Sequence, residues 1–440
     1  MRACLLTVWA RASLAVVFAS SVSASIQAQL PNASAAAFGM GGNFTAIARG
    51  YEAVAWNPAN LAMPGRPFFS LGLGIAGGSA GMDPIDVGAL ASYGGRVIDS
   101  ATRVAWIDKV RIAGGQRINA DAGFTPVAVS VGPVGFQLGA ATYSNVRLTP
   151  DAWEAWLFGN EGRSIGQPKA LDFAGTTVRV GAITSGGLSY ALPIPINLTN
   201  GLLHPEHAAI AVTAKYVRGQ GVVMAQDNGS TTLDANGNVL LNLPVIVPDE
   251  NRSFSQGLGN GVGADLSVAW SGGPWKVGLL AENVFNTFRW DTTDLAFRPG
   301  TGTFDGVTMT TNFDQLPYAS APQALKDLVA SQRLKPALAL GASFQLLPSL
   351  ILTADMKRYT GGDEAIIIGP KAHFGVGAEW RVLPFIPLRG GVASVTGGWQ
   401  AGAGVGLTFA GYEFGLSSSI RQRGQATESG LMIGLVGIGR

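Results

Sequence analysis

The feature that most constrains the fold is a repeated alternation of apolar residues with small or polar residues, in segments of about ten residues. In VGADLSVAW (262–270), Val262 and Leu266 share one face of an extended chain, and Asp265 falls on the opposite face. The segment AHFGVGAEWRV (372–382) alternates in the same way, with its charged residues on one face only. Further examples are IAVTAKYV, WKVGLLAEN, ALALGASFQL, LILTADMK and AGVGLTF. The pattern predicts an all-β protein.

A soluble β-sandwich also alternates, so composition is needed to decide between the two. The chain of 440 residues is 47% hydrophobic and only 13% charged, against about 25% charged in an ordinary soluble domain. No uninterrupted apolar run reaches the roughly 20 residues that a membrane-spanning helix needs. Because only helices and closed barrels satisfy every backbone group in lipid, we expect a transmembrane antiparallel β-barrel. An interfacial aromatic girdle is expected from Tyr216, Trp270, Trp275, Trp380 and Tyr412.

Loop lengths also favour the barrel. About 14 strands are predicted, starting near 67, 118, 134, 169, 207, 258, 275, 335, 349, 371, 386, 400, 411 and 430. Short connections are expected at 132–133, 271–274, 347–348, 384–387 and 410–411, with a moderate one at 192–206. Long connections alternate with them, at 78–116, 148–168, 220–257, 291–334, 361–369 and 422–428. This alternation is typical of outer-membrane barrels, whose short turns are periplasmic.

The N-terminus predicts export. Residues 1–28 combine arginines, an apolar stretch and a small-residue cleavage site, as a signal peptide does, and they contain Cys4, the only cysteine. Removing Arg2 and Arg11 leaves 28 basic residues against 28 acidic ones, a balance that gives no support to nucleic-acid binding. We therefore expect a protein of the bacterial outer membrane without disulfides.

The stretch FGMGGNFTAIARGYEAVAWNPANLA (38–62) precedes the first predicted strand. Its glycines suggest a phosphate-binding loop, but such a loop follows a strand and carries a Lys with Ser or Thr, and neither condition is met. Inside a barrel, this segment would form a plug in the lumen. The stretch resembles the N-terminal signature of FadL/TodX-type hydrophobic-compound transporters and their PorV-like relatives, and the matching positions are Gly39, Gly41, Gly42, Thr45, Ala46, Trp56, Asn57, Pro58 and Ala59.

The resemblance implies a barrel of 14 strands, an N-terminal hatch in its lumen, and passive uptake of small hydrophobic molecules such as fatty acids or hydrocarbons. We expect residues 29–66 to form the plug and residues 67–440 the barrel. The alternative function is a scaffold for secretion or surface attachment without transport, as in PorV-like relatives. An open aqueous porin is a third interpretation, which a plug disfavours. A gating plug and a fixed plug both remain open.

Charged residues on the predicted inner faces form the second candidate site. Buried charges must be paired, so these residues are expected to link the wall to the plug. A sharper hypothesis is that Arg381 or Arg389 binds the carboxylate of a fatty acid, as bidentate Arg–carboxylate geometry favours. The predicted set is Lys215, Asp265, Lys276, Glu282, Asp355, Lys357, Glu379, Arg381 and Arg389.

Catalysis has little support in the sequence. His204 and His207 have metal-ligand spacing, but Pro205 breaks any helix that would align them, so a periplasmic turn is the simpler interpretation. His373 lies near Glu379 with no marked serine beside it. We expect no enzyme, no metal and no cofactor. The expected partners are outer-membrane lipid and a small hydrophobic ligand, and no protein partner is identified. Helical patterns in the long loops cover 87–110, 151–160 and 320–334, the last with Ser320 as N-cap.

Overall fold

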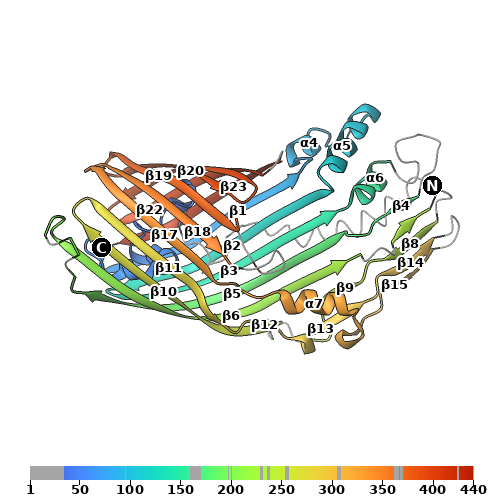
Figure 1. The fold of residues 1–440 in the computed structure, drawn as a ribbon, viewed down its shortest axis with the longest axis horizontal. Coiled ribbons are helices and arrows are strands. Elements are labelled where there is room, and N and C mark those ends of the chain that lie inside the picture. Colours follow the sequence, from blue (N-terminus) through green and yellow to red (C-terminus); the bar gives the residue numbers. More distant parts are fainter. Residues whose placement is uncertain are drawn as a thin grey trace.

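The computed structural model describes residues 34–440 except for positions 95, 159–169, 197, 200, 228–230, 235–237, 253–256, 305–308, 361–365, 367–369, 424, 425 and 440. The predicted signal peptide, residues 1–28, lies outside the described residues, as does the beginning of the segment predicted as the plug. The chain from Ser34 onward folds into a short helical segment followed by a large antiparallel sheet (Figure 1).

The sheet closes into a barrel of 14 strands. Each strand pairs antiparallel with the next one in the chain, and the last strand pairs with the first from Ser70–Gly439 to Ala80–Ser429. The strands are β1 (Phe69–Asp83), β2 (Gln116–Val131), β3 (Val134–Leu148), β5 (Thr177–Ile194), β6 (Glu206–Gln226), β10 (Gly259–Gly272), β11 (Trp275–Asn286), β17 (Ala337–Leu347), β18 (Leu350–Tyr359), β19 (Ala372–Leu383), β20 (Ile386–Val395), β21 (Gly398–Phe409), β22 (Tyr412–Arg423) and β23 (Ala426–Gly439). The predicted fold class is confirmed.

The alternating pattern predicted the start of most strands to within a few residues, because it marks which residues face inward. The exception is the strand predicted near 169, since β5 begins at Thr177. The earlier residues Leu171–Asp172 form β4 of a separate sheet, and Gly175 turns the chain between them with a φ of +92°. The connection predicted to be long at 422–428 is also shorter than expected, because β22 and β23 extend to Arg423 and from Ala426.

Large apolar side chains cover the outer surface of the wall. Phe374 is 63% exposed and Tyr216 is 53% exposed, while the residues that alternate with them in their strands face the interior. Trp275, Trp380 and Tyr412 are exposed near the tight turns, as an interfacial girdle requires. So extensive an apolar surface is stable only against lipid, and the barrel is therefore a transmembrane one. None of the helices in the described part of the chain is long and apolar enough to cross a membrane.

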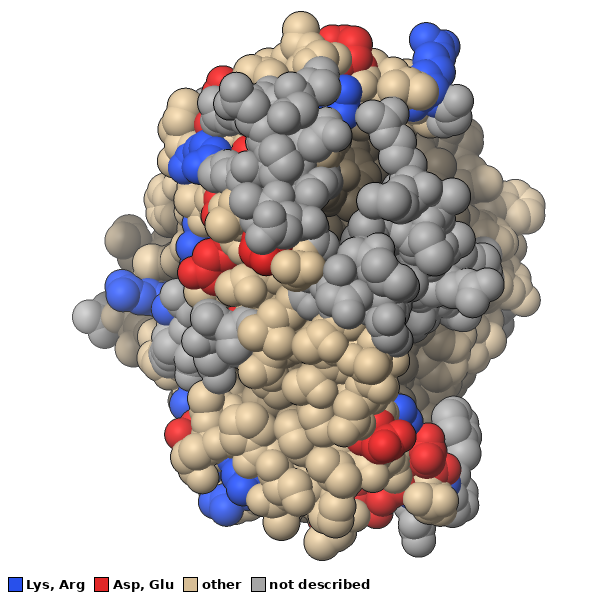
Figure 2. Space-filling view, turned by 90° about the vertical axis from the view of Figure 1, so that its right-hand side faces the viewer, with Lys and Arg blue, Asp and Glu red and all other residues tan. Residues whose placement is uncertain are grey.

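The long connections fold together at the end of the barrel opposite the tight turns (Figure 1). They contain α4 (Val87–Ala91), α5 (Ser100–Ile112), α6 (Pro150–Phe158) and α7 (Gln323–Ser331). A five-stranded sheet lies beside them, in the order β15 (Met309–Asn312), β14 (Thr301–Phe304), β8 (Val239–Asn242), β7 (Thr232–Leu233) and β4. Figure 2 shows this end, where the described charged side chains lie mainly toward the rim and a hollow opens near the centre.

The outer helices occur where the sequence predicted helical loops, but the pattern predicted over 87–110 forms two helices, α4 and α5, and α7 starts later than predicted. The N-cap of α7 is Pro322 rather than the predicted Ser320. Ser320 is instead the last residue of the short 3-10 helix η5 (Tyr318–Ser320). Pro322 lies outside the helix, with a ψ of 146°, and makes no side-chain capping hydrogen bond. In α5, the Asp99 carboxylate caps the first turn by accepting a hydrogen bond from the Thr102 amide.

An apolar cluster fills the outer part of the lumen, and we call it the outer chamber. The wall strands β3, β5 and β6 and the helix α7 surround it. Three short strands complete its boundary: β9 (Val245–Pro248), β12 (Arg289–Trp290) and β13 (Leu295–Arg298). The strand β13 also pairs with β16 (Leu316–Pro317). Its buried members include Tyr143, Val217, Phe288, Trp290, Leu325 and Leu328.

Candidate functional site

The plug, described from residue 34 to residue 66, lies against the inner face of the wall near the tight turns. It consists of α2 (Ala35–Gly39), η1 (Gly50–Glu52), α3 (Ala53–Trp56) and η2 (Pro58–Ala62). An apolar cluster forms its own core and includes Phe44, Trp56 and Leu61. The Phe44 and Trp56 rings meet edge to face with centroids 5.8 Å apart. The predicted hatch segment is thus a folded unit within the barrel.

The Asn-Pro turn fixes the plug to β10. Asn57 caps η2, where its Oδ1 accepts a hydrogen bond from the Ala59 amide at 3.2 Å. Its Nδ2 donates to the Val268 carbonyl of β10 at 3.1 Å. The Ala59 amide also donates to Ser267 Oγ of the same strand, at 3.0 Å. Pro58 and Ala59 are buried beside it. One asparagine therefore stabilises the turn and attaches it to the wall.

The glycine cluster makes a second attachment, to β18 and its neighbours. Gly41 and Gly42 have φ of +65° and +88°, conformations that favour glycine. The turn that they form presents Asn43, whose Nδ2 donates to the Val376 carbonyl at 3.0 Å. Beyond it, the Thr45 amide donates to Asp355 Oδ1 at 3.0 Å. Both glycines therefore serve a backbone turn, and no anion-binding role is needed to explain them.

The wall contributes glycines of its own where it touches the plug. A Cβ atom built on Gly391 would lie 2.0 Å from the Met40 carbonyl oxygen, and one built on Gly402 would lie 2.5 Å from the Phe38 oxygen. Gly39 is similarly close to Gly404. The plug backbone therefore approaches the strand backbone directly. These wall glycines were not predicted as site residues, although they stand at inward positions of their strands.

Most of the predicted charged residues divide into two separate groups. The first lies below the outer chamber, where Lys215 Nζ is 2.5 Å from Asp265 Oδ1 and 2.7 Å from Asn283 Oδ1. Lys357 Nζ is 3.0 Å from Glu282 in the same group. All of these residues belong to wall strands. This group therefore joins the wall strands to one another, and Asp355 is the predicted member that bonds the plug directly.

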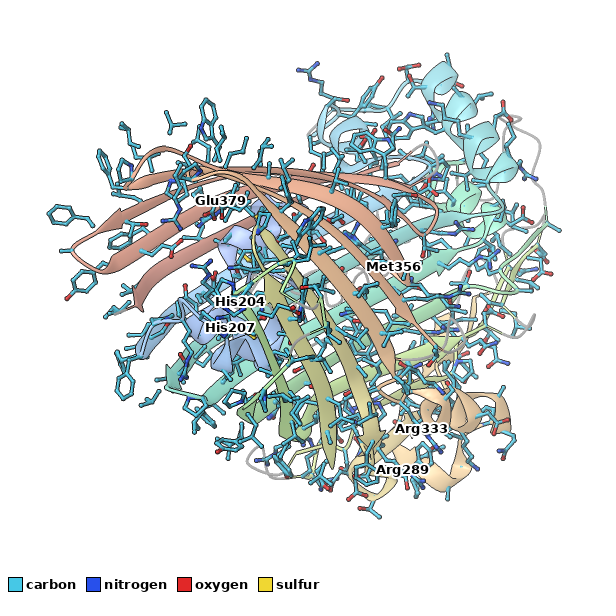
Figure 3. The ribbon with its side chains drawn as sticks, turned by 60° about the vertical axis from the view of Figure 1, so that its left-hand side comes forward. His204, His207, Arg289, Arg333, Met356 and Glu379 are labelled. Atoms are coloured by element: carbon cyan, nitrogen blue, oxygen red, sulfur yellow. The ribbon has the colours of Figure 1, made fainter. Side chains whose placement is uncertain are left out.

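The second group lies nearer the tight turns, where Figure 3 places Glu379. Arg389 Nε donates to Glu379 at 2.9 Å, and its Nη2 donates to Glu413 at 2.9 Å. Arg381 Nε donates to the other Glu379 oxygen at 3.1 Å. Glu413 was not predicted, although it faces inward from β22.

These contacts bear on the fatty-acid hypothesis. The Arg389 guanidinium is buried and already donates to the carboxylates of Glu379 and Glu413. It is therefore poorly placed to bind the carboxylate of a fatty acid as well. Arg381 was expected on the inner face, but its side chain is 50% exposed because it lies close to the turn at the end of β19. Lys276 is half-buried and makes no ion pair with another described residue.

A third polar group was not predicted from the sequence, although its members stand at inward positions. Arg421 donates to Glu428 at 3.1 Å and to Gln400 Oε1 at 2.9 Å. Gln400 in turn donates to the Gly41 carbonyl at 2.8 Å. The alternation of β21 and β22 places Gln400 and Arg421 inward, and that signal could have found them. This group, unlike the first, extends from the wall to the plug.

The histidines occupy three different settings. His373 is buried, with Nε2 3.1 Å from Asn43 Oδ1. His204 and His207 are exposed near the tight-turn end, one in the connection before β6 and one at its start (Figure 3). Among the residues that the structure describes, no group of three or more His, Cys, Asp or Glu side chains is arranged to hold a metal ion.

Comparisons with known proteins find distant likenesses among solved structures. No family model and no curated protein matches the chain. Among solved structures, the toluene transporter TodX of P. putida is 12% identical, with 92% of this chain and 98% of that chain covered and a TM-score of 0.46. A FadL homologue of Pseudomonas aeruginosa is 12% identical, with 94% and 99% covered and a TM-score of 0.46. The monoaromatic hydrocarbon channel CymD is 12% identical, with 92% and 96% covered and a TM-score of 0.45. Likenesses this distant carry no inference about function, and the barrel and its plug rest on the strand pairing and contacts described above.

Proposed function

We propose that this protein is a passive outer-membrane channel that admits small hydrophobic molecules, such as fatty acids or hydrocarbons. The observation that carries the proposal is the outer chamber, an apolar cluster of buried side chains at the outer end of a plugged barrel. Side chains of β3, β6 and α7 contribute to this cluster. Such surroundings favour an apolar solute over a sugar or an ion.

The plug supports the same interpretation by opposing an open aqueous pore. It is attached on one side to β10 through Asn57 and on the other to β21 through Gln400. Its side chains form a buried apolar core. A polar solute would therefore meet first the apolar chamber and then this packed segment.

The test is to identify what the purified protein retains. Lipid extraction and native mass spectrometry of the full-length protein should recover an aliphatic or aromatic molecule reproducibly. Val217→Gln places an amide in the outer chamber, where Val217 is 2% exposed, and should lower recovery at least tenfold. Tyr216→Gln changes the adjacent residue, which faces outward, and should leave recovery unchanged. Sugar permeation in a liposome-swelling assay would contradict the proposal and favour a porin.

A scaffold without transport is the second candidate, and the outer helices favour it. Apolar side chains are exposed on Ile112 of α5, on Trp156 of α6 and on Val97 in the connection between α4 and α5. Trp153 stacks on Trp156 with centroids 4.8 Å apart, which holds the exposed ring in place. Recovery of a stoichiometric protein partner without any small ligand would support the scaffold and contradict the channel.

A further inference from the structure

The apolar outer surface of β6 ends in a polar residue at each end. Its outward apolar row runs from Ile210 to Tyr216. Glu206 lies before this row at the tight turns, and Arg218 lies after it at the outer end. At about 3.3 Å per residue and a tilt of about 40°, the stretch from Glu206 to Arg218 rises roughly 30 Å, which is close to the thickness of the hydrocarbon layer. The two polar borders therefore lie near the two headgroup levels of the membrane.

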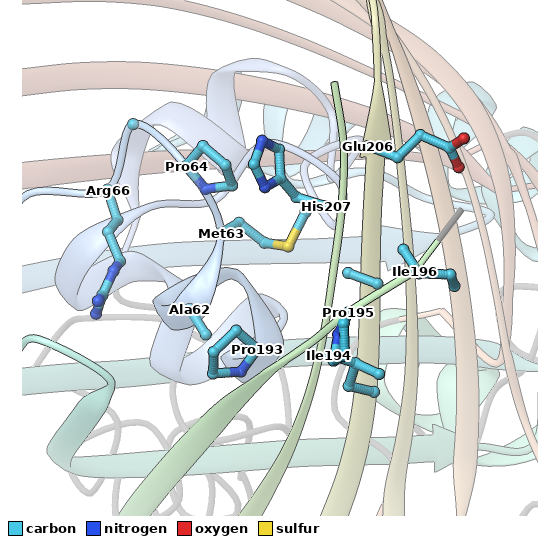
Figure 4. Close-up of a pocket in the computed structure, with 12 residues that line it drawn as sticks. Ala62, Met63, Pro64, Arg66, Pro193, Ile194, Pro195, Ile196, Glu206 and His207 are labelled. Atoms are coloured by element: carbon cyan, nitrogen blue, oxygen red, sulfur yellow. The ribbon is translucent and has the colours of Figure 1, made fainter. Parts of the chain in front are cut away.

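The border at the tight turns is satisfied within the protein. Figure 4 shows Glu206 there, with its carboxylate pointing away from the plug residues Met63 and Pro64. This carboxylate accepts hydrogen bonds from the Thr199 amide at 2.9 Å and from Trp270 Nε1 at 3.1 Å. An acidic group whose partners are already in place offers no site for an anion.

The border at the outer end is a row of polar side chains across four strands. Arg218 lies opposite Thr184 of β5 on one side and opposite Asn260 of β10 on the other. Asn260 in turn lies opposite Arg289 of β12. Because neighbouring strands are about 4.8 Å apart, the backbones of the two arginines are about 10 Å apart. We call these four residues the outer row.

The outer row faces the membrane side of the wall rather than the lumen. Arg218 lies two positions beyond Tyr216, which is 53% exposed on the outer surface. Arg289 is exposed (Figure 3), whereas Phe288 and Trp290 on either side of it are buried in the outer chamber. The row is therefore accessible to the headgroups of outer-leaflet lipids, since the long connections of such a barrel are extracellular.

Neighbouring acids do not balance the charge of the outer row. The strands β5, β6, β10, β11 and β12 contain acidic residues only at the other border or buried in the lumen, namely Glu206, Asp265 and Glu282. Asp291 follows β12, but its carboxylate accepts from the Thr293 amide and hydroxyl as the cap of η4 (Thr292–Asp294). The Arg289 side chain makes no hydrogen bond or ion pair with another described residue. Two cations at this spacing repel each other unless an anion lies between them.

We propose that the outer row binds a phosphorylated glycolipid of the outer leaflet. The phosphate lies between Arg218 and Arg289, since guanidinium groups match phosphate oxygens in a bidentate geometry. The Asn260 amide and the Thr184 hydroxyl suit a headgroup that carries sugar hydroxyls beside its phosphate. The acyl chains lie along the apolar row that ends at Tyr216. A lipid reaches the outer row from the membrane without entering the lumen, so the proposal does not depend on transport.

The first test is native mass spectrometry of the full-length protein with added diphosphorylated lipid A, its dephosphorylated form or phosphatidylglycerol. We expect adducts of the diphosphorylated form to exceed those of the other two at least fivefold. Arg289→Gln should reduce these adducts at least threefold, and Arg218→Gln/Arg289→Gln at least tenfold. Arg358→Gln is the matched control, because Arg358 is also exposed at the outer end of its strand but lies opposite the apolar residues Leu338 and Ala372.

The outcomes separate the parts of the proposal. Equal binding of phosphatidylglycerol would overturn the assignment to a glycolipid. Equal binding of the dephosphorylated form, or an equal loss in Arg358→Gln, would overturn the outer row as a phosphate site. Heat-dependent migration in gel electrophoresis establishes that each variant is a folded barrel.

The second test locates the lipid. Lipid A with a photoreactive group on an acyl chain should label peptides that contain Tyr216 or Val262, the exposed apolar residues next to the outer row. Labelling confined to the strands from β17 to β22 would overturn the proposal. Arg289→Gln should retain the ligand of the outer chamber, because its side chain faces the membrane. A failure of this proposal can therefore be distinguished from a failure of the channel proposal.

Discussion

The barrel wall has two unlike halves. The strands from β17 to β22 have 10 to 12 residues, and we call them the short wall. The wall strands β1, β2, β3, β5 and β6 have 15 to 21 residues, and we call them the long wall. The short wall meets the plug through glycines and backbone atoms, whereas the long wall, which also contacts the plug, extends farther outward and borders the apolar chamber.

The difference shows how one barrel combines two kinds of packing. On the short wall, Gly391 and Gly402 allow the plug backbone to approach without intervening side chains. On the long wall, large side chains such as Tyr143 and Val217 fill the space beneath the outer loops. The short wall should therefore tolerate no added side chain, and the long wall should tolerate no lost one.

The largest expected effect is that of removing a large side chain from the outer chamber. Phe288 is 1% exposed and meets Trp290 edge to face at 5.3 Å. Phe288→Ala should lower the free energy of unfolding of the outer layer by about 3–5 kcal/mol, the usual cost of such a cavity. Faster hydrogen exchange in α7 would measure it. Phe285→Ala is the control, because Phe285 is 55% exposed on the lipid-facing surface.

Adding a side chain to the short wall should have the next largest effect. Gly391→Leu places Cβ 2.0 Å from the Met40 carbonyl oxygen, so the plug must move. Overpacking of this kind costs about 1–3 kcal/mol. We expect new protease cleavage within residues 35–62 and higher ion conductance in planar bilayers. Gly390→Leu is the matched control, since a Cβ there meets no atom within 4 Å. Wild-type conductance in Gly391→Leu would show that this contact does not hold the plug.

Much of the barrel could be predicted, because alternation is a local signal that marks both strand and facing. It placed Lys215, Asp265 and Glu379 inward, where they are buried. The five-stranded outer sheet was missed because strands such as β4 and β7 have only two residues and carry no alternating pattern. A strand that short is fixed by tertiary packing rather than by its own sequence.

The site was predictable only in part. The turn at Asn57 could be inferred because its hydrogen bond to Ala59 is local. The partners of the plug could not, since Thr45 and Asp355 are separated by 310 positions and no single-sequence pattern relates them. The same limit explains why the charged residues were expected to form one network, whereas they form separate groups.

A smaller effect is expected from the turn that joins the plug to β10, between the two halves. Asn57→Ala removes the cap of η2 and leaves the Val268 carbonyl without its side-chain donor. The loss should be about 0.5–2 kcal/mol, as for other capping residues. Hydrogen exchange of residues 57–63 should accelerate while exchange in β20 stays unchanged. If both regions accelerated equally, the plug would be attached as one unit, and the contrast between its two attachments would be wrong.

The smallest effect concerns α5, in the outer layer above the long wall. The Thr102 amide and hydroxyl donate to the Asp99 carboxylate and hold its pKa below the usual value. A lowered pKa in the folded protein means that the cap stabilises α5 at neutral pH and that this contribution is lost as the pH falls through the folded pKa. Hydrogen exchange of residues 100–112, corrected for intrinsic rates, should therefore be faster at pH 3 than at pH 7. Asp99→Asn keeps a capping oxygen without a titrating group, so its protection should not depend on pH. If the wild-type protein and Asp99→Asn showed the same pH dependence of exchange, a group other than Asp99 would cause it. The Asp99 cap would then make no charge-dependent contribution to the stability of α5 above the long wall.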